Sequence, residues 1–148
     1  QNKLCAAYIF LAQGTPFING GQEFMRTKQG DENSYISDDD INGIDFDFTT
    51  KFADVVSVYK GLIALRHSSD AFTNAKNVAA VKVKEGLTKY TVEGTSDTFC
   101  VYFNATKTQQ SIDTTGYSKV IDITSGVVNS DTTLPSNVAG TDFVILQK

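Results

Sequence analysis

The sequence predicts one helix–strand–helix step of a (β/α)8 TIM barrel over residues 1–70, followed by an all-β antiparallel sandwich over residues 71–148. Two observations support this fold class. The chain opens with an apolar run, a tight turn and a shorter apolar run, which is the pattern of one barrel step. Beyond residue 70, short β-branched and aromatic runs alternate with turn residues, which is typical of an antiparallel sandwich.

The first element is a helix over residues 2–12, which is apolar nearly all round and should therefore be buried on most sides. Gly14 ends this helix, and residues 16–19 are expected to form a short buried strand closed by Gly20 and Gly21. The sequence contains only this one barrel step. We therefore expect residues 1–20 to be covered by the remainder of a barrel, by a second copy of the chain, or by the chain's own sandwich.

Residues 25–50 are polar and acidic and are expected to form a long loop, a type of segment that is usually functional or disordered. Thr49 or Thr50 should then cap a helix of about seventeen residues that ends before Ser68. The apolar face of this helix is expected to contain Phe52, Val55, Val56, Tyr59, Leu62, Ile63 and Arg66.

The sandwich is predicted from β-branched and aromatic runs separated by Gly, Asn and Pro. The expected strands are residues 78–83, 87–92, 98–103, 119–123 and 143–146. In the third of these strands, Phe99, Val101 and Phe103 share one face and Cys100 and Tyr102 share the other. Because both faces are apolar, this strand should be covered on two sides.

Charge and composition exclude several classes of partner. The net charge is −4 and no Lys/Arg cluster occurs, which argues against nucleic acid and anionic membranes. The longest apolar stretch is about half of a bilayer span. Cys5 and Cys100 have no neighbouring histidine, so a zinc site is not expected. No cofactor is predicted for the chain. Both lie in apolar runs and are expected to be buried free thiols, although two cysteines also allow a disulfide.

Two further polar features are expected to be structural. The run Asp38–Asp39–Asp40 lacks the spacing of a calcium loop and should be a solvated acidic turn. The only histidine, His67, should cap helix carbonyls or face solvent. The acidic sandwich, rich in Ser, Thr, Asn and Asp, favours an extracellular or cell-surface location over the cytoplasm.

Residues 14–23 have the form G-x-P-x-x-x-x-G-x-E, which resembles the eighth-strand signature of glycoside hydrolase family 13, the α-amylase superfamily. The continuation through residues 24–28 (FMRTK) and residues 30–35 (GDENSY) resembles the pullulanase branch of that family. Residues 59–66 are similar to the family's last barrel helix, although Phe46 stands where the family usually has Trp. The resemblance implies that residues 1–70 form the last helix–strand–helix step of the barrel and that the chain is a C-terminal fragment of the enzyme.

This resemblance implies a retaining debranching enzyme that hydrolyses α-1,6-glucosidic bonds in pullulan, starch or branched dextrins with two carboxylates. In the family these carboxylates come from earlier barrel strands, and no acid in this sequence matches them. The resemblance therefore implies catalytic residues upstream and an inactive isolated chain. The alternatives are a related α-glucan hydrolase, such as an isoamylase or neopullulanase, and a non-catalytic carbohydrate-binding or structural β-sandwich module.

The polar loop is the place where substrate contacts are expected, because sugar hydroxyls bind planar donors and acceptors and sugar rings stack on aromatic faces. The resemblance implies that Glu23 supports the site without touching substrate. Arg26 has an alternative role, in which it pairs with Asp31 or Glu32 and only holds the loop. The candidate glucan-binding residues are Arg26, Asp31, Asn33 and Tyr35.

Overall fold

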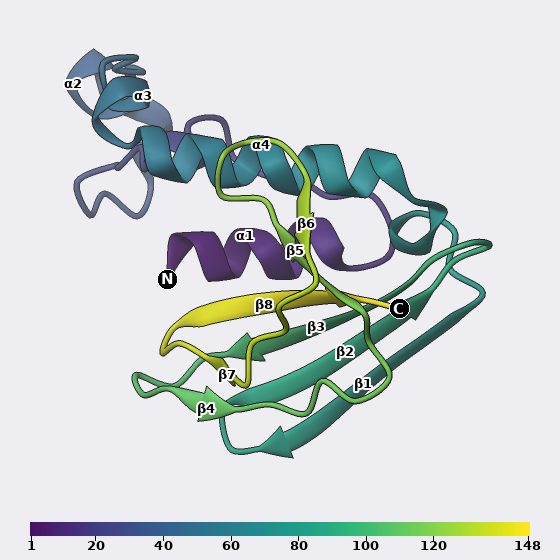
Figure 1. Cartoon of the computed structure of the whole chain (residues 1–148). Helices are drawn as coiled ribbons and strands as arrows, with labels where there is room; N and C mark the ends of the chain where they lie inside the picture. The colour runs from purple at the N-terminus through teal and green to yellow at the C-terminus, as the bar shows by residue number, and fades with distance from the viewer.

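The computed structural model describes all 148 residues and shows helices packed on one face of an antiparallel sheet (Figure 1). The six-stranded sheet has the order β1-β2-β3-β8-β5-β6, and β4 and β7 form a separate pair. The strands are β1 (Asn77–Lys84), β2 (Leu87–Glu93), β3 (Thr98–Asn104), β4 (Gln110–Ser111), β5 (Lys119–Asp122), β6 (Asn129–Asp131), β7 (Asn137–Val138) and β8 (Asp142–Gln147). The helices are α1 (Asn2–Leu11), α2 (Asp39–Asn42), α3 (Phe48–Lys51) and α4 (Ala53–Ser68), with 3-10 turns η1 (Gln22–Phe24), η2 (Ser34–Ile36) and η3 (Asp70–Phe72).

All five strands expected from the sequence are confirmed, each within about two residues of its predicted ends. Every pairing in the six-stranded sheet is antiparallel. The prediction for β3 is also confirmed. Phe99, Val101 and Phe103 belong to the large core beneath the helices, whereas Cys100 and Tyr102 belong to a smaller apolar cluster on the opposite face, together with Val138 of β7.

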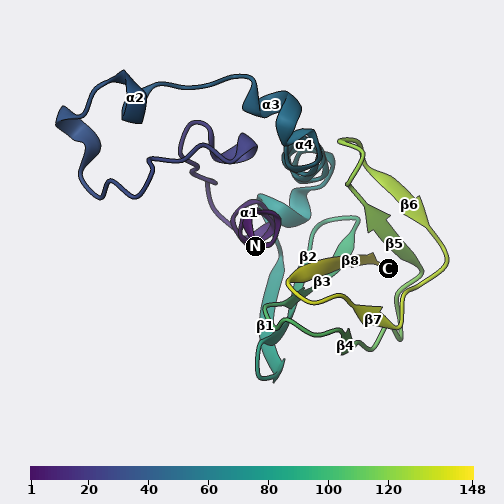
Figure 2. The same cartoon turned by 90° about the vertical axis from the view of Figure 1, so that its left-hand side faces the viewer.

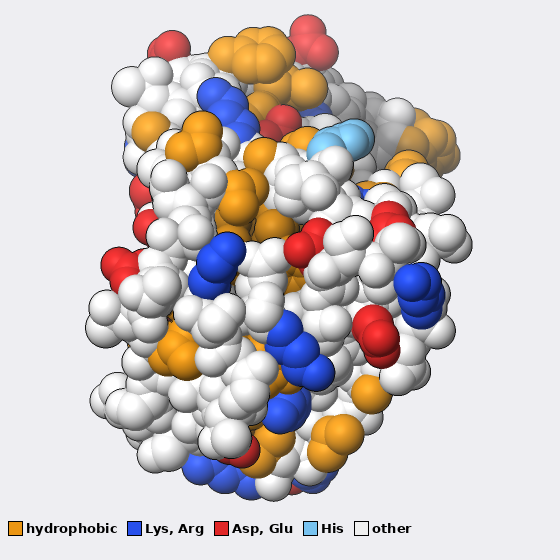
Figure 3. Space-filling view, turned by 45° about the vertical axis from the view of Figure 1, so that its right-hand side comes forward, with side chains coloured by type: hydrophobic (Ala, Val, Ile, Leu, Met, Phe, Trp, Pro, Cys, Tyr) orange, Lys and Arg blue, Asp and Glu red, His pale blue; other side chains and the backbone are white.

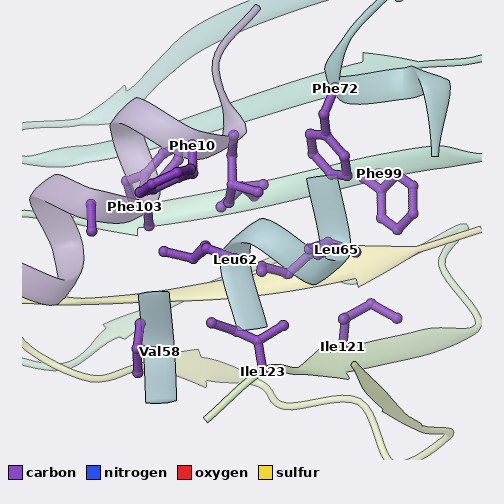
Figure 4. Close-up of a cluster of buried hydrophobic side chains, with 14 of the residues drawn as sticks. Phe10, Val58, Leu62, Leu65, Phe72, Phe99, Phe103, Ile121 and Ile123 are labelled. Carbon is purple, nitrogen blue, oxygen red and sulfur yellow. The ribbon is translucent and has the colours of Figure 1, made fainter. Parts of the chain in front are cut away.

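The large core joins the helices to the sheet (Figure 4). Apolar side chains of α1 and α4, including Phe10 and Leu62, meet side chains of β3 such as Phe103. Residues from both sides of the boundary expected near residue 70 contribute to this one core. The division into a barrel-derived part and a sandwich stays a prediction.

Arg66 of α4 fastens the C-terminal end of α1. It is 8% exposed, and its guanidinium donates hydrogen bonds to the carbonyls of Phe10 and Ala12, both at 2.7 Å, and to that of Gly14. Burial lowers the pKa of Arg66, and the nearby Tyr90 partly opposes this effect. The cation therefore binds the carbonyl groups that a helix end leaves without partners.

The predicted barrel strand over residues 16–19 is wrong: this segment is not a strand, and Phe17 is 88% exposed. A strand needs neighbours that pair with its backbone, and no other barrel strand is present to do so. Ile18, in contrast, packs against the large core.

Three more expectations for the helical part need correction. Thr49 and Thr50 do not cap α4, because they lie within α3, and α4 begins after Phe52 without a side-chain cap. The loop over residues 25–50 contains α2, α3 and η2. Cys5 is exposed, because it lies on the side of α1 that faces away from the core, while Cys100 is buried and both thiols are free.

The surface carries charges of both signs. Figure 3 shows acidic and basic side chains interspersed over one face of the molecule, with the histidine at the surface. This residue, His67, is exposed in the last turn of α4, as the sequence predicts. None of the helices is long and apolar enough to cross a bilayer.

Candidate functional site

The candidate site is the segment of residues 14–48, which contains most of the predicted polar loop and is called the polar loop from here on. It projects away from the sheet beside the N-terminal halves of α1 and α4 (Figure 2). Within the loop, Phe24 of η1 is buried, and its ring centroid lies 6.0 Å from that of Phe46. Two hydrogen bonds connect the loop to the helices. The Asn2 amide donates to the carbonyl of Gln22 at 3.1 Å and accepts from the Tyr59 hydroxyl at 3.0 Å. The loop is therefore held by both long helices.

A tight turn at Gly21 starts the site. Gly21 has φ of 91°, a conformation that side chains rarely adopt, and a Cβ placed there would lie 2.6 Å from the Cβ of Arg26. Its N–H donates to the Glu23 carboxylate at 3.0 Å, and its carbonyl accepts from the Arg26 N–H at 2.9 Å. In this geometry the Glu23 carboxylate holds the turn. That Glu23 supports the substrate site without touching substrate stays a prediction.

Arg26 ties the turn to the far end of the loop. Its guanidinium donates to the carbonyl of Gly20 at 3.3 Å and to that of Asn42, while its buried Nε has no partner. The alternative in which Arg26 pairs with Asp31 or Glu32 is wrong, because its partners are backbone carbonyls. Both terminal nitrogens of the guanidinium thus shape the loop.

Asn42 is the residue on which the loop converges, and the sequence did not single it out as a site residue. Its side-chain amide donates to the carbonyls of Ser34 at 2.7 Å and Ser37 at 2.6 Å. Its side-chain oxygen accepts from the Lys28 ammonium at 2.5 Å. The signal available in the sequence was an amide residue within a polar loop, and this pattern does not identify the hydrogen-bonded centre.

The other candidate residues lie on a separate, exposed turn. Asp31 accepts from the Ser37 hydroxyl at 2.6 Å and from the Asn33 N–H at 2.9 Å, and these bonds, the one from Ser37 first, lower the pKa of Asp31. Tyr35 is 81% exposed, and the side chains of Asn33 and Tyr35 make no hydrogen bond within the chain. Asp31 therefore shapes the turn, while Asn33 and Tyr35 remain free to bind a ligand.

One residue of the acidic run Asp38–Asp39–Asp40, which follows this turn, has a structural role. Asp38 caps α2, and its carboxylate accepts from the Asp40 N–H at 3.2 Å. All three carboxylates of the run are exposed.

A cavity of about 260 Å³ opens beside Arg26. Its walls are rich in amide and cationic donors and contain no carboxylate. They are formed by Asn2, Asn19, Gly20, Gln22, Met25, Arg26 and Lys28. Such walls can bind hydroxyl or other oxygen-rich groups, but they offer neither a nucleophile nor a general acid. The structure thus brings Arg26 into a cavity and leaves Asp31, Asn33 and Tyr35 outside it.

Comparison with known proteins identifies relatives of the chain, although no protein-family model matches the sequence. The chain is 53% identical to the pullulanase of Bacillus subtilis (strain 168) over 72 residues, which are 49% of this chain and 10% of that protein. It is 34% identical to the isoamylase of Pseudomonas amyloderamosa over 65 residues, which are 44% of this chain and 8% of that protein. The chain therefore matches about a tenth of the length of these relatives.

Solved structures match nearly the whole chain. A Bacillus subtilis pullulanase solved with maltose has a TM-score of 0.80 and 30% identity, covering 99% of this chain and 23% of its own. The pullulanase of Anoxybacillus sp. LM18-11 solved with maltotetraose has a TM-score of 0.82 and 25% identity, covering 99% of this chain and 23% of its own. The chain is therefore similar to pullulanases in sequence and in structure, and it matches their C-terminal region.

Proposed function

We propose that these residues form the C-terminal part of a pullulanase-type enzyme that hydrolyses α-1,6-glucosidic bonds in pullulan, starch or branched dextrins. The observation that carries this proposal is the 53% identity to a pullulanase over 72 residues. The catalytic carboxylates of the retaining mechanism would then come from the larger part of the polypeptide that lies outside the match. On this proposal the chain alone has no hydrolytic activity.

In this proposal the polar loop supplies glucan contacts. Tyr35 offers an exposed aromatic face for a sugar ring, and the free amide of Asn33 offers a donor and an acceptor for hydroxyls. Arg26 would line the cavity in which a ligand binds, while its two terminal guanidinium nitrogens hold the loop. Glu23 would keep the Gly21 turn in place, and Asp31 would orient the turn that carries Asn33 and Tyr35.

An isoamylase-like specificity is the second candidate, and it is supported by the 34% identity to an isoamylase over 65 residues. The greater identity to a pullulanase favours pullulan as the substrate. An extracellular or cell-surface location is also proposed, on the composition of the sandwich alone.

The test is a chimera in which this chain replaces the matching segment of the Bacillus subtilis pullulanase. We expect the chimera to release reducing sugar from pullulan and the isolated chain to release none. Tyr35→Ala should lower kcat/KM on pullulan by about tenfold, the loss expected when one good ligand contact is removed.

The matched control is Ile36→Ala. Ile36 is the neighbour of Tyr35 on the same turn and is 78% exposed, but its side chain offers no aromatic face. This variant should keep the activity of the chimera within about twofold. Equal losses in the two variants would show that Tyr35 only shapes the turn. A chimera that folds and cleaves glycogen but not pullulan would favour the isoamylase-like specificity.

A further inference from the structure

The chain contains two asparagine–glycine pairs, Asn19–Gly20 and Asn42–Gly43, and both lie in the polar loop. An asparagine in such a pair can lose its side-chain amide without an enzyme, because glycine has no side chain to keep its backbone nitrogen away from the amide carbon of the asparagine. The reaction requires that the asparagine side chain can rotate and that the glycine N–H is not held in a hydrogen bond. The two pairs differ in both respects.

The pair Asn19–Gly20 is free to react. Both residues are exposed, and they open a turn that the N–H of Gln22 closes on the carbonyl of Asn19 at 3.0 Å. The side chain of Asn19 and the N–H of Gly20 make no hydrogen bond within the chain; the bonds of these two residues use the Asn19 backbone and the Gly20 carbonyl. No atom lies within 4 Å of the Cβ position at Gly20, so the space around this peptide is open.

The pair Asn42–Gly43 is held in place. The Asn42 amide donates to two backbone carbonyls at 2.7 and 2.6 Å, and its oxygen accepts from the Lys28 ammonium at 2.5 Å. The N–H of Gly43, which follows the last residue of α2, donates to the carbonyl of Asp39 at 2.8 Å. The attacking nitrogen and the group that it would attack are therefore both occupied, and the loop must open before this pair can react.

We propose that Asn19 is a site of spontaneous deamidation in the folded chain and that Asn42 is protected from the same reaction. The Gly20 nitrogen attacks Cγ of Asn19 and forms a new N–C bond, while the bond from Cγ to Nδ2 breaks. The amide nitrogen leaves as ammonia and takes the proton of the Gly20 N–H. Water then opens the cyclic imide at one of its two carbonyls, which gives aspartate or isoaspartate. The reaction needs no oxidant, reductant or other co-reactant.

The surroundings of Asn19 favour this reaction. Asn19 lines the cavity of about 260 Å³ together with Arg26 and Lys28, and no carboxylate lines it. Positive charge stabilises both the anion that forms when the Gly20 nitrogen loses its proton and the carboxylate of the product. Deamidation therefore gives the cavity a carboxylate that can pair with Arg26 or Lys28. This inference does not depend on the glucan-binding role of the loop.

The test compares the two pairs within one sample. The folded 148-residue chain is incubated in a mildly alkaline buffer, and peptide mapping by mass spectrometry follows the conversion of each asparagine to aspartate or isoaspartate. Because Asn42 must first lose several hydrogen bonds, we expect Asn19 to be converted about tenfold faster or more. In guanidinium chloride the native hydrogen bonds are absent, and the two rates should agree within about twofold.

Gly20→Ala tests the role of the attacking nitrogen. The backbone of Gly20 is not left-handed and its Cβ position is open, so the variant should fold, which circular dichroism checks. The added methyl group restricts the approach of the nitrogen and should slow the conversion of Asn19 by about tenfold or more. The conversion of Asn42 should not change and serves as the internal control.

Three results would overturn the proposal. One is that Asn19 and Asn42 are converted at equal rates in the folded chain, because the hydrogen bonds of Asn42 would then give no protection. Another is that Asn42 is converted first. The third is that folded Gly20→Ala is converted at Asn19 as fast as the wild type, which would show that water hydrolyses the amide directly.

Discussion

The substitution Arg66→Met removes the guanidinium that binds the end of α1 and keeps an unbranched side chain that can fill most of the same space. Three carbonyls, those of Phe10, Ala12 and Gly14, lose their charged donor. The first of these hydrogen bonds is buried, so water cannot replace the donor without entering the core. The end of α1 should therefore loosen from α4.

The expected loss of unfolding free energy is about 3 kcal/mol. A hydrogen bond to a charged group contributes roughly 1.5–3 kcal/mol, and a cation at a partly buried helix C-terminus contributes up to about 2 kcal/mol. These values cannot be summed, because the variant also no longer buries a positive charge, and the lowered pKa of Arg66 indicates that this burial is costly. A loss of this size is a large part of the roughly 5–15 kcal/mol that stabilises a domain.

Urea unfolding followed by circular dichroism measures this loss. The control is Lys3→Met, which removes the ion pair between Lys3 and Asp54 at 2.7 Å. Because both side chains of that pair are exposed, at 40% and 69%, the control should lose less than about 1 kcal/mol. The reasoning about Arg66 is refuted if Arg66→Met unfolds at the same urea concentration as the wild type, or if the two variants lose equal stability.

Two further predictions concern packing and pH. Gly61→Ala should destabilise the chain by about 2 kcal/mol, because its Cβ would lie 2.1 Å from the carbonyl oxygen of Ile123. The control Gly20→Ala should not destabilise it, because no atom lies within 4 Å of the Cβ position there. Urea unfolding midpoints compare the two variants, and equal midpoints would contradict the close contact at Gly61. Burial is the main cause that raises the pKa of Tyr117 from 10.0 to about 12, and a hydrogen bond with Cys100 is the second. The neutral phenol therefore contributes its full stability below pH 10, and this contribution is lost between pH 10 and about 12. Tyr117→Phe should flatten that part of the stability curve, and a curve as steep as that of the wild type would exclude Tyr117 as its source.

The sheet was predictable from the sequence because each long strand has its own local signal. Runs such as residues 98–103 combine β-branched and aromatic residues with flanking turns, and the structure follows them closely. The strand at residues 16–19 failed for the opposite reason. Its apolar side chains are a local signal, but a parallel strand also requires neighbours that the chain does not contain.

The polar loop was predictable as a loop, but its internal arrangement was not. Residue types identified Arg26 as a donor, yet they could not show that its partners are the carbonyls of Gly20 and Asn42. Backbone carbonyls occur at every residue, so a sequence pattern cannot reveal which of them a side chain will bind. The same limit concealed the central place of Asn42 and left the helix end bound by Arg66 unpredicted.

The two-sided burial of β3 leaves its alignment with the neighbouring strands poorly specified by hydrophobicity. In a strand with one polar face, a shift by one residue would bury every polar side chain, so burial alone fixes the alignment. Between Phe99 and Phe103 such a shift would exchange Phe and Val for Cys and Tyr, and both faces would remain apolar. Some other residue must therefore distinguish the correct alignment from the shifted one.

Asn104, the last residue of β3, can make this distinction. Its side chain is fully buried, and its amide donates to the carbonyls of Thr108 and Ala139, both at 2.8 Å, while its oxygen accepts from the N–H of Thr106 at 3.0 Å. In a shifted strand these partners would be lost, at a cost of about 1–3 kcal/mol for each buried group left unpaired. A single polar side chain thus encodes the strand alignment that the apolar residues on the two faces could not, and it makes the native pairing unique among those that bury the same surface.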